Sequence, residues 1–382
     1  MPGDRFHGAR LRFARLFNEL SPADLAERTG VTRQYIHGLE IDDRSPSKEL
    51  VNVLAFVLHV APGFFYRGVS TTVVEEYCHF RSRKMTPVFA RQECIARGTL
   101  FDELMEHLDG LLRLPRVDID PCEARDRNSI EEITLKYRKR WGLGEGPISN
   151  MCRVVEQRAG AVVTYFPGAS EKVDAFSISR PRPIVVRNPA KQSSVRMRFD
   201  LAHELGHLIM HYGLETGDEI TEEQANIFAS AFLLPRRPFI AEFPHRMPFD
   251  WGALYEMKRR WKVSVAAILF RARDLGLIDP AQYRIACQHL SKTGQKRKER
   301  LDDEIPMEQP ELLETALKKY DQLSNRSLNS LAQELEVTPL FLRRLAGFEL
   351  ISADEWDNDP SVVKLADYRN VHGQRNRRRK TP

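Results

Sequence analysis

The sequence predicts a multidomain protein that is mainly α-helical, with a central unit of α+β class and helical units on both sides of it. The 382 residues exceed the usual size of one domain. Apolar residues recur at helical spacing towards both ends of the chain. Runs rich in β-forming residues occur in the middle, over 161–166 and 184–186. The predicted segments are 1–70, 71–130, 131–290 and 291–382.

The composition is that of a soluble globular protein. Hydrophobic residues make up 42% of the chain and charged residues 29%, which excludes wholesale disorder. No run approaches the roughly 20 apolar residues of a membrane helix, and the first residues lack the apolar core of a signal peptide. We therefore expect a cytoplasmic protein without a membrane partner.

Cysteine usage and net charge narrow the function classes further. The five cysteines lie far apart and form no C-x-x-C pair, which argues against a disulfide scaffold and against a thiolate zinc finger. The formal net charge of +5 permits contact with nucleic acid without requiring it. The cysteines are Cys78, Cys94, Cys122, Cys152 and Cys287.

Residues 21–40, SPADLAERTGVTRQYIHGLE, predict two short helices that meet at an angle. Ser21 can cap the first helix, and Pro22 suits its first turn. Gly30 permits a tight turn into a second helix that begins near Thr32. This arrangement predicts a helix-turn-helix.

The run resembles the XRE/Cro-repressor family of DNA-binding domains, and the similarity continues through Glu40, Arg44 and Pro46. The resemblance implies DNA as a partner and a recognition helix whose opening residues reach base edges or phosphates in the major groove. Asp42 and Asp43 depart from the family's pattern and would repel phosphate. The alternative is a helical domain kept for dimerisation or for docking a repressor. The candidate DNA-binding residues are Thr32, Arg33, Gln34 and Tyr35.

The next part of the chain divides into a connector and a longer α+β unit. Residues 71–130 contain helical segments interrupted by prolines, which is typical of a connector, and we assign them no chemistry. Helices are expected over 196–212, 222–234 and 249–261. The stretch 292–304, KTGQKRKERLDDE, has the composition of a solvated linker.

The most informative motif of the chain is His203-Glu204-Leu205-Gly206-His207. On a helix, this H-E-x-x-H spacing places two imidazoles on one face, one turn apart, where they can hold one zinc ion. Glu204 then lies beside the first ligand and can accept the proton of a water molecule that attacks a carbonyl group. The motif indicates metal-dependent hydrolysis of an amide bond.

A catalytic zinc site needs a third protein ligand and an open position. Glu222 is favoured because it shares a helical stripe with small residues that would pack closely on the metal helix, and Thr221 is expected to cap its helix. Glu223, the neighbouring alternative, points about 100° away. His211, one turn beyond the motif, would be poorly aimed and is expected to support the ligands or the fold. Gly213 occupies the position of the third histidine in the metzincin pattern.

The segments RFDLAHELGHLIMH and EEQANIFASAFLLP resemble the ImmA/IrrE family of zinc metallopeptidases. The similarity extends over 131–290 and includes RKRWGLGEGPISN, IVVRN and KRRWKVSVAAILFRARDLGLI. It implies a zincin-like fold, with His203, His207 and Glu222 as gluzincin-like metal ligands, Glu204 as base and a DNA-bound XRE-type repressor as substrate. Such a donor set also accepts Mn²⁺ or another divalent cation.

Substrate engagement is expected near the sheet. Residues 174–186 are predicted to include an edge strand, and an extended substrate can add to such an edge by main-chain hydrogen bonds. An ordinary sheet strand that does not touch substrate is the equally favoured alternative.

The last segment contains SLNSLAQELEVTPLFLRRLAG, which repeats the outline of a helix-turn-helix. Glu336 stands where the turn glycine would be, so left-handed geometry would be strained and a plain helical hairpin is at least equally favoured. The basic end, Arg375 to Lys380, is expected to be a solvated terminus rather than a phosphate contact.

These inferences together predict a regulatory zinc-dependent endopeptidase joined to a DNA-binding domain. The expected reaction is cleavage of an XRE-type transcriptional repressor, or of the chain itself, in response to stress or to a signal from a phage or mobile element. The alternative is a non-proteolytic XRE-type regulator or antitoxin-like protein with a structural or vestigial metal site. A homodimer is expected only by analogy with helix-turn-helix proteins that read paired half-sites.

Overall fold

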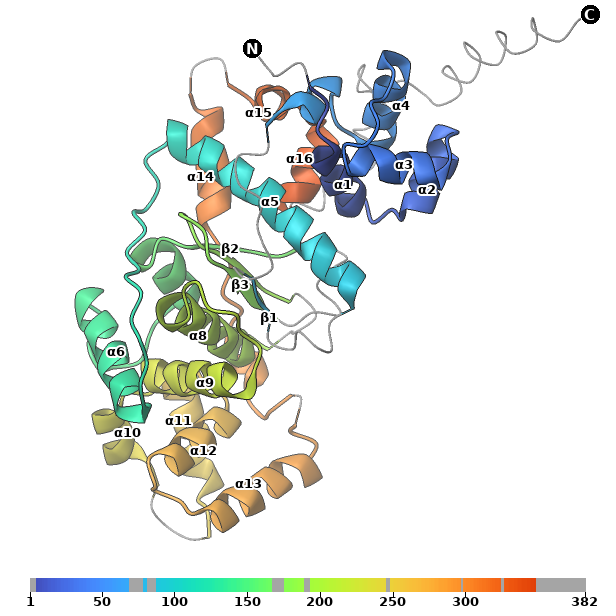
Figure 1. Ribbon diagram of the computed structural model, residues 1–382. Coiled ribbons are helices and arrows are strands. Elements are labelled where there is room, and N and C mark those ends of the chain that lie inside the picture. The colour runs from blue at the N-terminus through green and yellow to red at the C-terminus, as the bar shows by residue number, and fades with distance from the viewer. Residues whose placement is uncertain are drawn as a thin grey trace, which may run out of the picture. The chain divides into compact units, whose positions relative to one another are not determined.

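The structure of the chain is a computed structural model, drawn in Figure 1. Residues 1–347 form one compact unit. The basic end of the chain and Asp174, at the start of the expected edge strand, lie outside the described residues. The structure describes residues 5–68, 78–80, 87–166, 175–188, 193–244, 248–296, 298–323 and 326–347.

The N-terminal helices confirm the predicted helix-turn-helix. Ser21 Oγ accepts a hydrogen bond from the backbone N–H of Asp24, whose carboxylate accepts one from the N–H of Ser21. Gly30 ends the first helix of the pair with a φ of 72°. The hydroxyl of Thr32 caps the second helix by accepting from the N–H of Tyr35. The elements are α1 (Gly8–Phe17), α2 (Pro22–Thr29), α3 (Arg33–Glu40), α4 (Lys48–Leu58) and the 3₁₀-helix η1 (Pro62–Tyr66).

The segment 71–130 is more than a connector. Its long helix, α5 (Val88–Leu111), packs on α1, and the buried guanidinium of Arg97 donates to the backbone oxygen of Phe17. Its strand, β1 (Cys78–Phe80), belongs to the sheet of the protein. The segment therefore completes the core that lies between the N-terminal helices and the sheet.

Among the described residues, four short strands form a sheet in the order β1-β3-β4-β2. The strands β2 and β4 are parallel, whereas the other neighbours are antiparallel. Both strands formed by residues 175–188 are inner strands among the described residues, so the prediction of an edge strand there is wrong. The reason is the unforeseen strand β1, which pairs with the outer side of β3. The other strands are β2 (Val162–Thr164), β3 (Phe176–Ile178) and β4 (Ile184–Val186).

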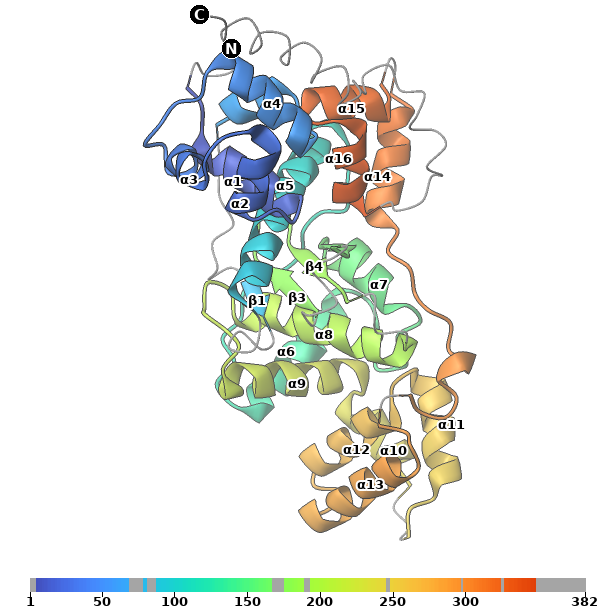
Figure 2. The ribbon, with the colours of Figure 1, turned by 90° about the vertical axis from the view of Figure 1, so that its right-hand side faces the viewer.

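The helices of the middle third lie where the sequence predicts them, with one corrected cap. The start of the helix expected at Glu222 moves to Glu219, because Asp218 accepts hydrogen bonds from the N–H groups of Ile220 and Thr221. Thr221 is therefore not the cap. The helices, most of which Figure 2 shows, are α6 (Arg127–Arg140), α7 (Met151–Arg153) with a following π-helical turn (Val154–Arg158), α8 (Ser194–Met210), α9 (Glu219–Leu233), α10 (Arg236–Glu242), α11 (Trp251–Trp261), α12 (Val265–Asp274) and α13 (Pro280–Lys292).

The stretch 292–304 is anchored to the fold, which corrects the prediction of a solvated linker. Lys258 of α11 is buried, and its Nζ donates to Glu299 at 2.8 Å and to Asp302 at 2.5 Å. The Glu299 carboxylate also accepts from the first two backbone N–H groups of α12. Composition alone does not reveal such an anchor, because each buried charge is compensated by a partner that is distant in the sequence.

Three helices close the compact unit, and they share a core with the N-terminal helices. Between the last two, Glu336 has a φ of 57°. The plain hairpin is therefore wrong, because the left-handed turn is formed without a glycine. Phe341 packs against Phe17 of α1, with ring centroids 4.0 Å apart. Among the described residues, no helix is long and apolar enough to cross a membrane. The helices are α14 (Leu312–Asp321), α15 (Leu328–Glu334) and α16 (Pro339–Ala346).

The two faces of the sheet belong to different cores, because successive side chains of a strand point to opposite sides. Phe176 and Ile178 of β3 contribute to the core that contains α1, α5 and the C-terminal helices. Val163 and Val185 contribute to the core around α8 and α9. Ser177, between Phe176 and Ile178, therefore faces α8, and polar side chains on this face can reach the helix that carries the H-E-x-x-H motif.

Candidate metal centre

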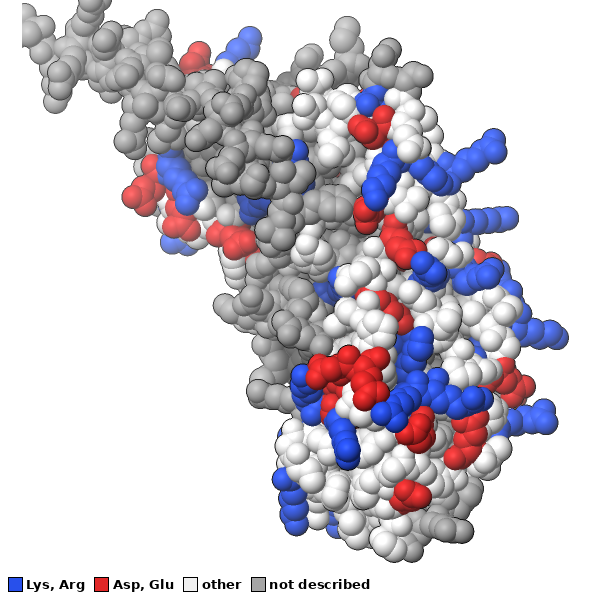
Figure 3. All heavy atoms as spheres, turned by 180° about the vertical axis from the view of Figure 1, so that it is seen from behind, with Lys and Arg blue, Asp and Glu red and all other residues white. Residues whose placement is uncertain are grey.

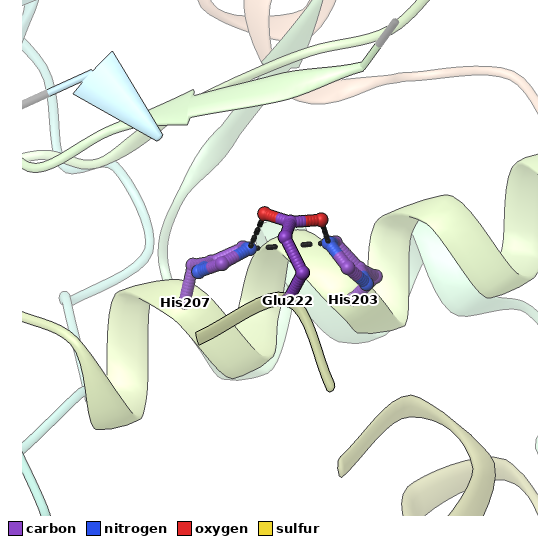
Figure 4. Close-up of side chains that lie close together, drawn as sticks. All are labelled: His203, His207 and Glu222. Carbon is purple, nitrogen blue, oxygen red and sulfur yellow. Dashed lines mark hydrogen bonds and ion pairs between the residues drawn. The ribbon is translucent and has the colours of Figure 1, made fainter. Parts of the chain in front are cut away.

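His203, His207 and Glu222 bring three possible ligand atoms together, as Figure 4 shows. The two histidines lie one turn apart on α8, and Glu222 reaches them from α9. The Nε2 atoms of His203 and His207 are 3.1 Å apart. The two Glu222 oxygens lie 3.4 Å from His203 Nε2 and 3.2 Å from His207 Nε2. Both imidazoles are buried and the carboxylate is partly buried.

Close packing of α8 on α9 determines which acidic residue reaches the histidines. A Cβ atom at Gly206 would lie 3.0 Å from the ring of Phe228, so glycine allows the two helices to approach closely. Glu222 is thereby directed to the histidines. Glu223 is exposed and pairs with Arg127 at 2.5 Å, away from the cluster. The structure thus brings together the three predicted ligands and leaves the neighbouring alternative outside.

The imidazole of His203 is oriented by Asn226 of α9. His203 Nδ1 and Asn226 Oδ1 are 3.0 Å apart. Because an amide oxygen can only accept, this contact places the ring proton on Nδ1 and leaves the lone pair of Nε2 directed at the cluster. From the sequence alone, Asn226 is only one of the residues that share a helical stripe with Glu222. Its hydrogen bond to a ligand depends on how the two helices are rotated against each other.

A second chain of contacts orients His207 in the same way. The amide nitrogen of Gln224 donates to the backbone oxygen of Ala124, which directs Gln224 Oε1 to His211 Nε2 at 2.8 Å. The proton of His211 is then on Nε2, so its Nδ1 accepts from His207 Nδ1 at 2.9 Å. The Nε2 lone pair of His207 again faces the cluster. His211 therefore supports a ligand, as the sequence analysis expects.

The donor set fits a divalent cation such as zinc. Two imidazole nitrogens and one carboxylate converge, and with the ring protons on Nδ1 their lone pairs face one another, which favours a cation between them. Glu222 Oε1 is buried and has no hydrogen-bond donor among the described residues. Tetrahedral ligands at 2.0–2.1 Å from zinc are about 3.3 Å from one another. The three separations between the donor atoms are close to this value.

Glu204 is held between the sheet and the three ligands. The hydroxyl of Ser177, at the centre of β3, donates to Glu204 Oε2 at 2.7 Å. Burial raises the pKa of Glu204 to about 7, against the lowering effect of His203 and Ser177. A carboxyl group with a pKa near neutrality can both accept and return a proton. Burial also lowers the pKa of His207 to about 4, which keeps its imidazole neutral.

His79 of β1 is a residue of the site that the sequence analysis missed. Its ring stacks on the ring of His207, with centroids 5.3 Å apart. Its two nitrogens lie 3.0 Å from Thr216 Oγ1 and 3.0 Å from Ser179 Oγ. Burial and the nearby His207 and His211 hold the pKa of His79 well below its usual range. A single histidine in an apparent connector gives no local signal, so only the strand pairing reveals it.

A cavity of about 320 Å³ lies beside the metal helix. Phe199 of α8 and Phe270 of α12 supply apolar walls, and Asp200 adds an acidic group. Asn226 also lines the cavity, and the same side chain contacts His203. Asn226 thus contacts both this cavity and the first predicted ligand.

The predicted DNA-binding residues lie at the start of α3, but they differ in exposure. Arg33 and Gln34 are exposed, whereas the Thr32 hydroxyl is used as the helix cap. Tyr35 is partly buried, and its hydroxyl donates to the backbone oxygen of Ser45 at 3.2 Å. Within the part of the chain that the structure describes, Thr32 and Tyr35 therefore make structural contacts, whereas the side chains of Arg33 and Gln34 are open to solvent.

The acidic residues that depart from the XRE pattern have a structural explanation in one case. Asp42 Oδ1 accepts a hydrogen bond from the N–H of Gly8, the first residue of α1, at 2.7 Å.

Figure 3 shows Lys and Arg side chains interspersed with Asp and Glu over the face that it draws. The net positive charge is therefore not gathered into one basic area on that face.

Comparisons with known proteins agree with the geometry. Residues 156–273 match the family model of the IrrE N-terminal-like domain, and residues 11–65 match the helix-turn-helix model. The radiation response metalloprotease IrrE of Deinococcus radiodurans is 34% identical over 87 residues, which cover 20% of this chain and 26% of that protein. The match thus spans about a quarter of that relative. Both family resemblances seen in the sequence are confirmed as resemblances: a segment similar to the IrrE N-terminal-like domain follows a segment similar to helix-turn-helix domains.

Proposed function

We propose that this protein is a regulatory metal-dependent endopeptidase whose helix-turn-helix domain binds DNA. The observation that carries the proposal is the convergence of His203, His207 and Glu222 beside the buried carboxyl group of Glu204. Zn²⁺ is the favoured ion, and Mn²⁺ or another divalent cation suits the same donors. The matched IrrE-like and helix-turn-helix domains support the same combination of activities.

The ligands are prepared for the ion by the residues around them. The metal, when bound, supplies Lewis-acid polarisation of the scissile carbonyl group. His203 and His207 would hold it through Nε2, because Asn226 and His211 engage the opposite ring nitrogens. Glu222 contributes a carboxylate, which adds a negative charge to the donor set. Such outer contacts fix the tautomer and the orientation of each ligand.

Glu204 transfers the proton that hydrolysis requires. As the oxygen of a water molecule forms a bond to the carbonyl carbon, one water proton passes to Glu204. The C–N bond of the peptide then breaks as Glu204 delivers that proton to the leaving nitrogen, which yields an acid and an amine. Ser177 engages Glu204 Oε2, so Oε1 is the oxygen that exchanges the proton.

The substrate class proposed is an XRE-type transcriptional repressor, or the helix-turn-helix domain of this chain itself. The DNA-binding domain would concentrate the peptidase at sites where such repressors act. Stress, or a signal from a phage or mobile element, would be the trigger. The name of the relative, a radiation response metalloprotease, supports this choice.

The proposed DNA contact uses Arg33 and Gln34, with Thr32 and Tyr35 shaping the start of α3. An exposed Arg and Gln at the beginning of a recognition helix are suited to base edges and phosphates of the major groove. A homodimer would be needed only if the protein reads two half-sites.

The deciding experiment compares new protein N-termini in cells that express wild type or Glu204→Gln, with and without DNA damage. Glu204→Gln should retain the metal and lose cleavage by a factor of about 10² or more. A terminus seen only with wild type, within a repressor or within this chain, is the expected result. Identical sets of termini, with DNA binding intact, would instead assign the chain to the non-proteolytic regulators.

A further inference from the structure

Two stretches of the chain are related by sequence although they lie in its first and last parts. Residues 54–67 read LAFVLHVAPGFFYR, and residues 331–344 read LAQELEVTPLFLRR. The identical pairs all have the same separation along the chain. We call these stretches the N-terminal repeat and the C-terminal repeat. The identical pairs are Leu54 and Leu331, Ala55 and Ala332, Leu58 and Leu335, Val60 and Val337, Pro62 and Pro339, Phe64 and Phe341, and Arg67 and Arg344.

The two repeats also share their backbone conformation. His59 and Glu336, at equivalent positions, both have a φ of 57°. Two residues later, Ala61 has φ and ψ of -79° and 155°, and Thr338 has -78° and 156°. In each repeat a proline then opens a helix, η1 in one case and α16 in the other. Each repeat is therefore a helix, a left-handed turn and a second helix.

The repeats pair with each other about a local two-fold axis. Val60 and Val337, which are equivalent, form an isolated antiparallel bridge. The N–H of Ala61 donates to the backbone carbonyl oxygen of Glu336 at 2.9 Å. The N–H of Thr338 donates to the backbone carbonyl oxygen of His59 at 3.1 Å. These two hydrogen bonds exchange places when the repeats are exchanged. Such reciprocity is the mark of an isologous contact, in which one patch meets its own equivalent.

The paired surface is apolar and closed. Leu54, Leu58 and Phe64 of the N-terminal repeat are buried, and so are Leu331 and Phe341 of the C-terminal repeat. The equivalent rings of Phe64 and Phe341 have centroids 6.2 Å apart. Without the C-terminal repeat, the apolar face of the DNA-binding domain that this repeat covers would be open to solvent, which the burial of large apolar side chains disfavours.

We infer that the C-terminal helices α14–α16 act as a built-in partner, occupying the face through which two copies of the helix-turn-helix domain would otherwise pair. The occupant that competes with them is a second copy of this chain, bound through its own N-terminal repeat. The N-terminal repeat pairs with the similar C-terminal repeat through reciprocal hydrogen bonds. The same geometry allows it to pair with the N-terminal repeat of a second chain. The inference does not depend on peptidase activity.

Local space at the contact is compatible with self-pairing. A Cβ atom at Gly63 would lie 2.6 Å from the carboxyl carbon of Glu336, so glycine makes room for the side chain at the turn of the opposite repeat. In a self-pair the same space would receive His59 of the second copy. Because Gly63 has no side chain, nothing at this position would block the imidazole of that His59.

The arrangement has a consequence for DNA recognition. The exposed Arg33 and Gln34 of α3 lie outside the paired face, so the intact chain presents one recognition helix without a symmetric partner. Release of α14–α16 would allow two chains to pair and to read two half-sites. The C-terminal helices thus control whether this face joins two DNA-binding domains.

Cysteine cross-linking tests the contact directly in the full-length chain, with the partly exposed Cys122 and Cys287 changed to serine. Facing residues of an antiparallel bridge are close enough for a disulfide. Val60→Cys with Val337→Cys should form a disulfide within one chain. Val60→Cys alone should not link two chains, whatever the oligomeric state. A link between chains in either variant would overturn the inference.

The second arm releases the built-in partner. Phe341→Asp, added to Val60→Cys, should undock the C-terminal repeat and produce the disulfide between two chains. Thr338→Pro repeats the test without a buried charge: it removes the N–H and the hydroxyl that contact His59, and with the hydroxyl the cap that α16 receives at the N–H of Phe341. A cooperative unfolding transition followed by circular dichroism shows that each variant is folded. Loss of the disulfide between positions 60 and 337 in the double-cysteine chain shows that the repeat is released. If both folded variants release the repeat and still form no link between chains, self-pairing is excluded.

Discussion

The imidazole of His79 stacks on the imidazole of His207 with their ring planes 5° apart. His79 belongs to β1, and hydrogen-bonding contacts with Ser179 and Thr216 hold both of its nitrogens. The ring of His207, the second predicted metal ligand, is therefore held in place by the His79 ring on the side that faces the sheet. His79 lies far from the H-E-x-x-H motif in the sequence.

Removal of the His79 ring should weaken metal binding. His79→Ala is expected to lower zinc affinity by a factor of about 10, because the His207 ring gains freedom of rotation. His79→Phe keeps a flat ring and should restore most of the affinity. Competition with a chelator measures the change, and His107→Ala, at a position on α5, is the control. Equal affinity in His79→Ala and wild type would show that the stack does not orient the ligand.

The two adjacent acidic residues of α9 should differ sharply in their effect on metal content. Glu222→Ala should reduce zinc from about one ion per chain to a small fraction, because it removes one of three protein ligands. Glu223→Ala should leave zinc content unchanged, since Glu223 pairs with Arg127. Atomic absorption after dialysis measures both. The reverse order would move the third ligand to Glu223.

The buried carboxyl group of Glu156 should make stability depend on pH. Burial raises its pKa from 4.5 to about 7, although backbone N–H groups of Glu311 and Leu312 bind the carboxylate. The folded state then holds this proton more tightly than the unfolded state. The contribution to stability is therefore fully present below pH 4.5 and is lost as pH rises through 7.

Comparison of wild type with Glu156→Gln isolates this contribution. Between about pH 4.5 and 8, wild type should lose up to about 3 kcal/mol of unfolding free energy relative to the variant. Urea unfolding followed by tryptophan fluorescence measures the difference at each pH. Glu145→Gln, at an exposed position, should run parallel to wild type. Parallel curves for Glu156→Gln as well would rule out this carboxyl group as the source.

The anchor of the stretch 292–304 should be essential for stability. Lys258→Ala leaves the carboxylates of Glu299 and Asp302 buried without their cation, and we expect a loss of about 3 kcal/mol in unfolding free energy. Lys298→Ala breaks only the exposed pair with Asp303 and should leave stability unchanged. Thermal unfolding separates the two variants. Equal midpoints would mean that the stretch is a free linker after all.

DNA binding should depend on the opening of α3. Arg33→Ala should weaken binding at least about fivefold in a gel-shift assay at low salt, through loss of a base or phosphate contact. Arg12→Ala removes an exposed charge from α1 and should have a smaller effect. Absence of DNA affinity in wild type, or equal affinity in Arg33→Ala, would favour a docking or dimerisation role for the domain.

Local patterns in the sequence predicted a large part of the fold. The capping residues Ser21 and Thr32 mark the starts of α2 and α3, because each supplies an oxygen to a backbone N–H group only three residues away. The β-rich runs at 161–166 and 184–186 became β2 and β4 for a similarly local reason. Strand β1 escaped prediction, since three residues carry no measurable alternation.

Charged and turn residues were less predictable than helices. Glu299 and Asp302 look solvated in the sequence, but Lys258 compensates them inside the fold. Glu336 adopts left-handed backbone geometry without glycine, because the hydrogen bond from Ala61 and the bridge at Val337 hold the turn from outside. In each case a distant partner overrides the local preference.

The sequence by itself determined the chemistry of the candidate site. Two histidines and a glutamate within five residues of one helix specify their own relative placement, because a helix places side chains four residues apart on one face. Only the tertiary structure decided between Glu222 and Glu223 as the residue that meets them. It also decided that Asn226 and His79 orient them and that residues 331–344 cover the helix-turn-helix domain. These contacts depend on the rotation and pairing of elements far apart in the chain, which no local periodicity encodes.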